Sequence, residues 1–71
     1  MSQHTLKAYV LHSIGRNAGE WVSVDRIAAR LGASYDKVHA TCAELLAQSQ
    51  VQHREQDGAH LYGIGIHGDE A

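Results

Sequence analysis

The stretch L-G-A-S-Y-D-K-V-H-A-T-C-A-E-L-L-A-Q, residues 31–48, decides how this chain folds. Gly32 can end one helix in the left-handed region of backbone conformation, and Ser34 can N-cap the helix that follows. Apolar side chains then recur at the spacing of a buried helical face. These inward positions are Val38, Cys42 and Leu45, with Leu46 at the margin. The stretch therefore predicts two helices joined by a tight turn, the second with an alanine-rich outer face.

The helix before this turn is predicted over about 24–31 and the one after it over about 35–48. Ser23 can N-cap the earlier helix, and Asp25 in its first turn favours the positive end of the helix dipole. Its inward side carries Val24, Ile27, Ala28 and Leu31.

A further helix is predicted at the start of the chain, over about 5–14, with Thr5 as its N-cap. Its predicted buried stripe is Leu6, Tyr9, Val10 and Ile14. The segment W-V-S-V, residues 21–24, is β-branched and aromatic enough for one short strand. We expect Trp21 and Tyr9 to be core aromatics.

A hairpin is predicted after the helices, over about 51–66. Asp57-Gly58 is a strong hairpin signal, because a type I′ turn needs positive φ at both central residues. This turn sets Glu55 opposite His60 and His53 opposite Tyr62. By two-residue alternation, one face of the second strand should carry Tyr62, Ile64 and Ile66. Residues 67–71 are predicted to be a polar C-terminal tail.

Length and charge limit the possibilities further. The 71 residues predict one α+β domain over residues 1–66, with marginal stability because a short chain buries little surface. The net charge is −2, yet residues 1–54 hold all six Lys and Arg against four acids, and residues 55–71 hold four acids alone. The negative net charge therefore comes from the C-terminal residues, and residues 1–54 are mildly basic. This distribution matters because affinity for nucleic acid depends on local charge.

Cysteine usage and hydropathy bear on localisation. Cys42 is the only cysteine, so no disulfide can form within the chain, and a reducing, intracellular setting is indicated. No charged-then-apolar leader and no run of about 18 apolar residues is present, so no membrane contact is expected. We expect a cytoplasmic protein.

From about residue 5 to residue 66 the chain resembles a bacterial winged helix-turn-helix domain. The resemblance is carried by V-S-V-D-R-I-A-A-R-L-G (22–32), A-S-Y-D-K-V (33–38) and V-Q-H-R-E-Q-D-G-A-H-L-Y-G-I (51–64). In size, and in the step from the turn through Tyr35 to Val38, it is also similar to the small fimbrial-operon regulators of enterobacteria. Such families often carry a glycine just after the third helix, where this chain has Ser49-Gln50.

The resemblance implies transcription regulation through double-stranded DNA, with the third helix in the major groove and the wing on the backbone or minor groove. The groove-facing residues that it implies are Ser34, Tyr35, Asp36, Lys37, His39, Ala40, Thr41 and Ala43. The wing residues that it implies are Arg54, Gln56 and His60.

The charged residues of this surface predict weak binding on its own. Base reading normally uses Arg, Lys, Asn or Gln, and the outer face of the third helix offers mainly Lys37. We expect phosphate neutralisation from Lys37 with Arg26, Arg30 and Arg54 around one end of the two helices. Fewer than about six such contacts per protomer would give weak binding that is lost as salt rises, so a homodimer or a larger regulatory protein would have to supply the remaining affinity.

Two readings of the alanine face stay open. Ala40, Ala43 and Ala47 can simply reflect helix propensity on a solvated surface, as the neighbouring cations also can. They can instead form a smooth patch for another helix, which would make the chain a protein-interaction module for a polymerase, replication factor or larger regulator. An enzyme is not expected, because the sequence shows no arrangement of a nucleophile with a base and no paired carboxylates.

Three other signals predict no site. The run from Gly63 to Gly68 fits G-x-G-x-x-G, but too few residues follow it to form the helix that would hold a phosphate. Six histidines lack the spacing of metal ligands, so no metal or cofactor is expected. His53 and His60 can approach across the hairpin, and a modest pH response is the simpler alternative to a metal site. Cys42 fits a buried small hydrophobe better than a redox switch.

Overall fold

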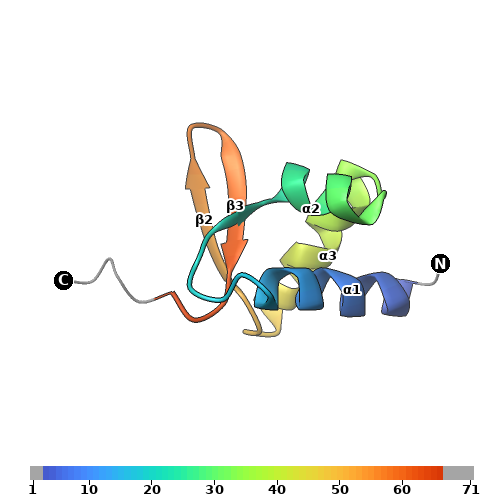
Figure 1. Cartoon of the computed structure of the whole chain (residues 1–71), viewed down its shortest axis with the longest axis horizontal. Coiled ribbons are helices and arrows are strands. Elements are labelled where there is room, and N and C mark those ends of the chain that lie inside the picture. The colour runs from blue at the N-terminus through green and yellow to red at the C-terminus, as the bar shows by residue number, and fades with distance from the viewer. Residues whose placement is uncertain (1–2, 67–71) are drawn as a thin grey trace.

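The computed structural model of this chain describes residues 3–66, with side chains from Thr5 onward. The elements are α1 (Gln3–Gly15), β1 (Val22–Ser23), α2 (Val24–Leu31), α3 (Tyr35–Ala47), β2 (Gln52–Gln56) and β3 (Ala59–Gly63). The helices gather on one side and the β2–β3 hairpin stands beside them (Figure 1). The topology is α+β and winged-helix-like, which confirms the predicted fold class. The predicted tail, residues 67–71, lies outside the described residues.

The caps around α2 and α3 form as predicted. The Ser23 hydroxyl accepts a hydrogen bond from the backbone N–H of Arg26, and the Ser34 hydroxyl accepts one from Lys37, both at 3.2 Å. Gly32 ends α2 in the left-handed region with φ 67°. These local bonds satisfy backbone groups that the helix ends leave without an intrahelical partner, so they stabilise the ends of both helices at the turn.

The first helix corrects two predictions. Thr5 lies inside α1 and not at its N-cap, since neither Gln3 nor His4 interrupts a helix that propagates cooperatively. Tyr9 is 50 % exposed and is no core residue, because the buried stripe runs through Leu6, Val10 and Ile14 with Ser13 beside them. Tyr9 lies to one side of that stripe.

The chain leaves α3 and enters the hairpin through Ser49, without a glycine at the helix C-terminus. Ser49 adopts φ 60°, the left-handed conformation that glycine usually supplies there. The N–H of Ser49 donates to the Leu46 carbonyl at 2.9 Å, and the N–H of Gln50 donates to the Leu45 carbonyl at 3.0 Å. This pair of bonds is the Schellman pattern. Ser49 therefore takes the left-handed position that glycine usually occupies at a helix C-terminus, at some cost in backbone strain.

The sheet has strand order β1-β3-β2 and is antiparallel throughout. Its hairpin register pairs Glu55 with His60 and His53 with Tyr62, and the turn has φ 53° at Asp57 and φ 80° at Gly58, all as predicted.

The predicted apolar face of β3 is wrong beyond Tyr62. The strand ends at Gly63, where an added Cβ would lie 2.9 Å from the Glu20 carbonyl oxygen, and Gly65 turns the chain at φ 69°. Ile64 packs partly buried against the core, while the Gln52 side chain accepts a hydrogen bond from the backbone N–H of Ile66 at 2.8 Å. The C-terminal segment is therefore fastened by side-chain hydrogen bonds and packing after the strand stops.

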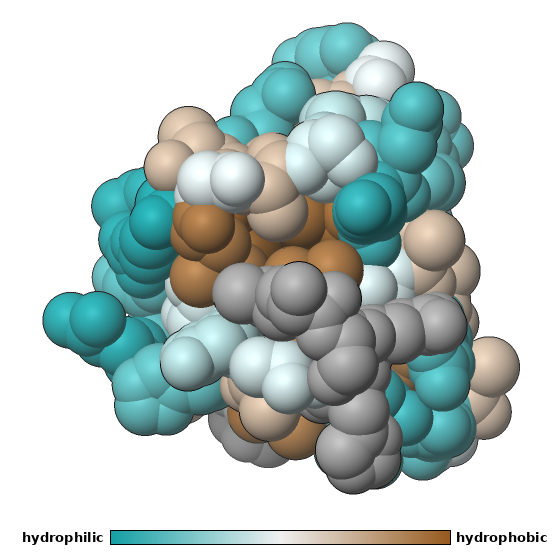
Figure 2. Space-filling view, turned by 90° about the vertical axis from the view of Figure 1, so that its right-hand side faces the viewer, coloured by the Kyte–Doolittle hydropathy of each residue, from teal (hydrophilic) through white to brown (hydrophobic). Residues whose placement is uncertain are grey.

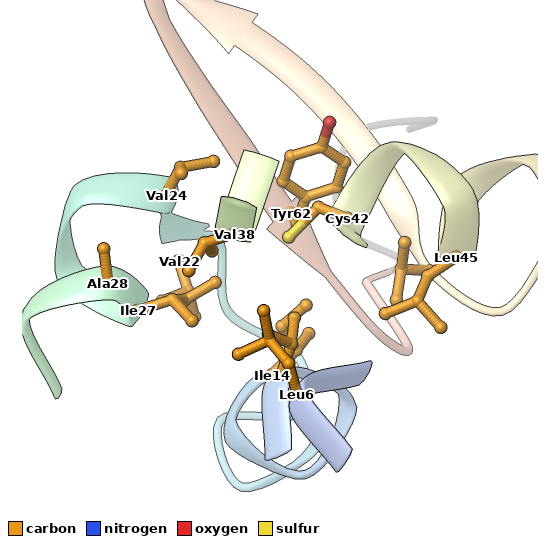
Figure 3. Close-up of a cluster of buried hydrophobic side chains, with 12 residues drawn as sticks. Leu6, Ile14, Val22, Val24, Ile27, Ala28, Val38, Cys42, Leu45 and Tyr62 are labelled. Carbon is orange, nitrogen blue, oxygen red and sulfur yellow. The ribbon is translucent and has the colours of Figure 1, made fainter. Parts of the chain in front are cut away.

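The core fixes α3 against the rest of the molecule. Val38, Cys42 and Leu45 are fully buried, as their spacing predicts, and they meet apolar residues from α1, α2, β1 and β3 (Figure 3). Burying each such side chain contributes roughly 1.5–3 kcal/mol, which is large for a domain of this size. On the side of the molecule seen in Figure 2, hydrophobic residues reach the surface, with hydrophilic residues to their left and right.

Candidate nucleic-acid interface

The exposed side of α3 carries most of the residues predicted to face a groove. Tyr35 is 38 % exposed, and His39 is partly buried. The other exposed members of the set are Ser34, Asp36, Lys37, Ala40 and Ala43. These residues form the outer face of α3, a surface of small side chains with Lys37 near its start. A helix with so little bulk can approach another surface closely.

Thr41 does not belong to this outer face. Its side chain is 2 % exposed, and its hydroxyl donates a hydrogen bond to the Lys37 carbonyl oxygen at 2.8 Å. At 100° per residue Thr41 lies about 60° from Val38, inside the buried arc. Because the hydroxyl is satisfied within the helix, threonine can be buried there without an orphaned polar group. The prediction that Thr41 is a surface contact is therefore wrong.

One edge of α3 is coupled to α1. Lys7 Nζ lies 3.2 Å from Glu44 Oε2, and both side chains are partly exposed. This ion pair neutralises a carboxylate close to the outer face. Lys37 lies seven residues, about two turns, before Glu44.

The cations of the interface are less concentrated than expected. Arg26 and Arg30 are exposed one turn apart on α2, and Lys37 is exposed at the start of α3. The Arg54 guanidinium lies 6.0 Å from the ring centroid of Trp21, a cation–π distance. Because side chains alternate across a strand, Arg54 projects from the hairpin face opposite to His53.

This placement corrects two expectations. The face that bears His53 is the one through which the hairpin meets α3, so Arg54, which was expected beside Lys37, projects from the hairpin face turned away from that junction. Trp21 is partly buried beside Arg54 and is no core residue.

The junction of α3 and the hairpin is a cluster of three imidazoles, His39, His53 and His60, called here the histidine cluster. The rings of His39 and His60 are 4.5 Å apart, and those of His53 and His60 are 5.4 Å apart. His53 Nε2 and His60 Nδ1 lie within hydrogen-bond distance at 3.1 Å. Tyr35 stacks on His39 at one end, and Tyr62 lies against His53 at the other.

Sequence patterns predict two of the three members of this cluster. The hairpin register predicts the approach of His53 and His60, which the structure confirms. The third member, His39, comes from α3, and no local pattern tells which side of the hairpin a helix will meet. Within residues 3–66, no three side chains of metal-binding type are placed to hold an ion.

Burial governs the two acidic groups behind this junction. Desolvation raises the pKa of the Cys42 thiol to about 12, so the thiol stays protonated. Desolvation also raises the pKa of Tyr62, with smaller contributions from Cys42 and Tyr35. Cys42 therefore behaves as the small hydrophobe that its spacing predicts.

No protein-family model, curated protein or solved structure matches this chain. The class is accordingly defined by topology: three helices followed by a C-terminal antiparallel hairpin, a winged-helix-like domain. In the described part of the chain, every helix is too short or too polar to cross a membrane.

Proposed function

We propose that this protein is a small DNA-binding transcription regulator that inserts α3 into the major groove and lays the wing along the backbone. The observation that carries the proposal is the capped turn between α2 and α3, which leaves Tyr35 and Lys37 exposed at the start of α3. In helix-turn-helix proteins the start of the second helix is where base edges are contacted.

The chemistry of this surface favours binding to the backbone over base reading. Lys37 is the one long cation on the outer face of α3, and alanines beside it offer only apolar contact to a thymine methyl group. Arg26 and Arg30 can add phosphate contacts from α2, whereas Arg54 is turned toward Trp21. About three phosphate contacts would lose roughly fortyfold in affinity when salt rises fourfold. A dimer, or a neighbouring DNA-bound protein, would supply the remaining affinity and the sequence preference.

A gel shift with promoter-length duplex DNA at about 50 and about 200 mM salt tests this proposal. We expect binding at the lower salt and its loss at the higher. Lys37→Ala should weaken binding and reduce the slope of log affinity against log salt by about 1, as expected for one phosphate contact. Arg54→Ala should have a smaller effect, because the Trp21 ring holds its guanidinium.

Arg16→Ala is the matched control, since it removes the same charge from an exposed position outside α2, α3 and the wing. Failure of the wild-type protein to bind any duplex at the lower salt would refute the proposal. Equal effects of Lys37→Ala and Arg16→Ala would show that the binding surface lies elsewhere.

A second candidate function is a protein-interaction module that docks a partner helix on α3. The observation favouring it is that Ala40, Ala43 and Ala47 are all exposed, with Leu46 38 % exposed beside them. Ala43→Arg separates the two functions, because a long cation would obstruct helix packing but spare or strengthen contact with DNA. Loss of DNA binding in this variant, with partner binding intact, would exclude the docking function.

A further inference from the structure

The histidine cluster occupies the junction at which a duplex lying on both α3 and the wing would run. His39 comes from α3, His53 from β2 and His60 from β3, so one group of imidazoles spans the parts that the proposed function assigns to groove and backbone. His53 is exposed, and His39 and His60 are each partly buried. Because the three rings lie close to one another, a ligand would contact their edges. These edges carry the N–H groups.

The short contact between His53 Nε2 and His60 Nδ1 restricts the protonation of the pair. At 3.1 Å one nitrogen must donate and the other accept. A neutral pair can meet this requirement, and so can a pair carrying one extra proton. A second proton makes both nitrogens donors and breaks the bond. Each proton gained adds an N–H donor and a positive charge at the surface. An oxyanion can accept a hydrogen bond from that donor and is attracted by the charge.

The groups around the cluster have mixed effects on its charge. Glu55 is the cross-strand partner of His60, and Asp36 lies one turn before His39 on α3. Tyr35 and Tyr62 close the two ends of the row, and Cys42 lies beneath Tyr62. Burial raises the pKa of both the Cys42 thiol and the Tyr62 phenol, so imidazole is the type of side chain here that changes charge near neutral pH.

We propose that the histidine cluster binds phosphate oxygens and takes up protons as it does so, which makes DNA binding by this protein tighten on acidification. The proposal rests on the proposed function for its ligand, the phosphodiester backbone. A phosphate close to the imidazoles raises their pKa in the complex above its value in the free protein. The added affinity is then fully present below the free pKa and is lost as pH rises through the pKa of the complex.

The test measures affinity for one duplex at about pH 7.5 and about pH 5.5, with ionic strength held constant. One imidazole whose pKa rises from about 6.5 to about 7.5 on binding gives roughly fivefold tighter binding at the lower pH, within a limit of about tenfold for one unit. His60→Gln and His53→Gln should each abolish most of this gain while keeping a hydrogen-bonding side chain. His12→Gln, at an exposed position on α1, should retain it in full. A gain undiminished in both His60→Gln and His53→Gln overturns the proposal.

A second measurement separates this proposal from the proposed function. The imidazole NMR signals of His53 and His60 are titrated with pH, with and without inorganic pyrophosphate. We expect pyrophosphate to raise both midpoints and to leave that of His12 unchanged. If the duplex does not bind at any pH but pyrophosphate raises the midpoints, the regulator function fails and the phosphate site stands. If pyrophosphate moves none of them and duplex affinity is independent of pH, the phosphate site fails.

Discussion

The inner and outer faces of α3 follow opposite rules. The inner face consists of Val38, Thr41, Cys42 and Leu45, and each of these residues is at most 2 % exposed. Its one hydroxyl, on Thr41, is hydrogen-bonded within the helix. The outer face carries mostly small side chains, with a single long cation. The inner face thus holds the fold with little tolerance for change, whereas the outer face costs the fold little and is free to vary with a partner. The predictions below test how sharp that division is.

The largest effect is expected from neighbouring leucines on the two sides of the division. Leu45→Ala should lower the free energy of unfolding by about 2–5 kcal/mol, because it removes a fully buried side chain and leaves a cavity. Leu46→Ala, at a side chain 38 % exposed, should change it by less than about 1 kcal/mol. Urea denaturation of both variants measures the difference. Similar losses in the two would mean that Leu46 is covered, and that the outer face is not open.

Alkaline pH should weaken the inner face through Cys42. The pKa of its thiol is about 12 in the folded protein, above the ordinary value of 9.0 that the unfolded chain retains. The raised pKa means that stability is complete below about pH 9 and falls by about 1.4 kcal/mol per unit as pH rises toward 12. Burial of Tyr62 acts in the same direction at higher pH.

Denaturation just above pH 9, compared with denaturation at neutral pH, measures this slope. In Cys42→Ala the Cys42 contribution should vanish, although the variant is less stable overall because a buried side chain is shortened. An identical pH dependence in the wild-type protein and in Cys42→Ala would show that the thiol has the same pKa in the folded and unfolded states.

The smallest effect is expected where the two faces end, at Ser49. Ser49→Gly should raise the free energy of unfolding by about 1 kcal/mol, since glycine adopts the observed φ of 60° without a Cβ clash. Thermal denaturation measures the gain. Ser49→Ala is the control and should bring none, because alanine keeps the Cβ. A stabilised Ser49→Ala would point to the hydroxyl, not the backbone, as the source of strain.

The elements that could be predicted are those specified by residues close in sequence. Ser23, Ser34 and Gly32 mark helix ends through bonds that span at most a few residues, and the Asp57-Gly58 turn fixes the hairpin register in the same way. The errors arose where a pattern leaves a residue near a boundary. Tyr9 and Thr41 lie at the edges of their helical faces, and what packs beside the helix decides whether an edge is covered.

The candidate site depends more heavily on such packing. Exposure of Lys37 follows from its place in the helix, but the turning of Arg54 toward Trp21 and the meeting of His39 with His60 join segments distant in the chain. The amino-acid sequence by itself determined the helices, the caps of α2 and α3, the buried seam of α3 and the hairpin, because hydrogen bonding and apolar periodicity are local. Only the tertiary structure decided which side of the wing faces α3, because that choice is made by the packing of the whole core.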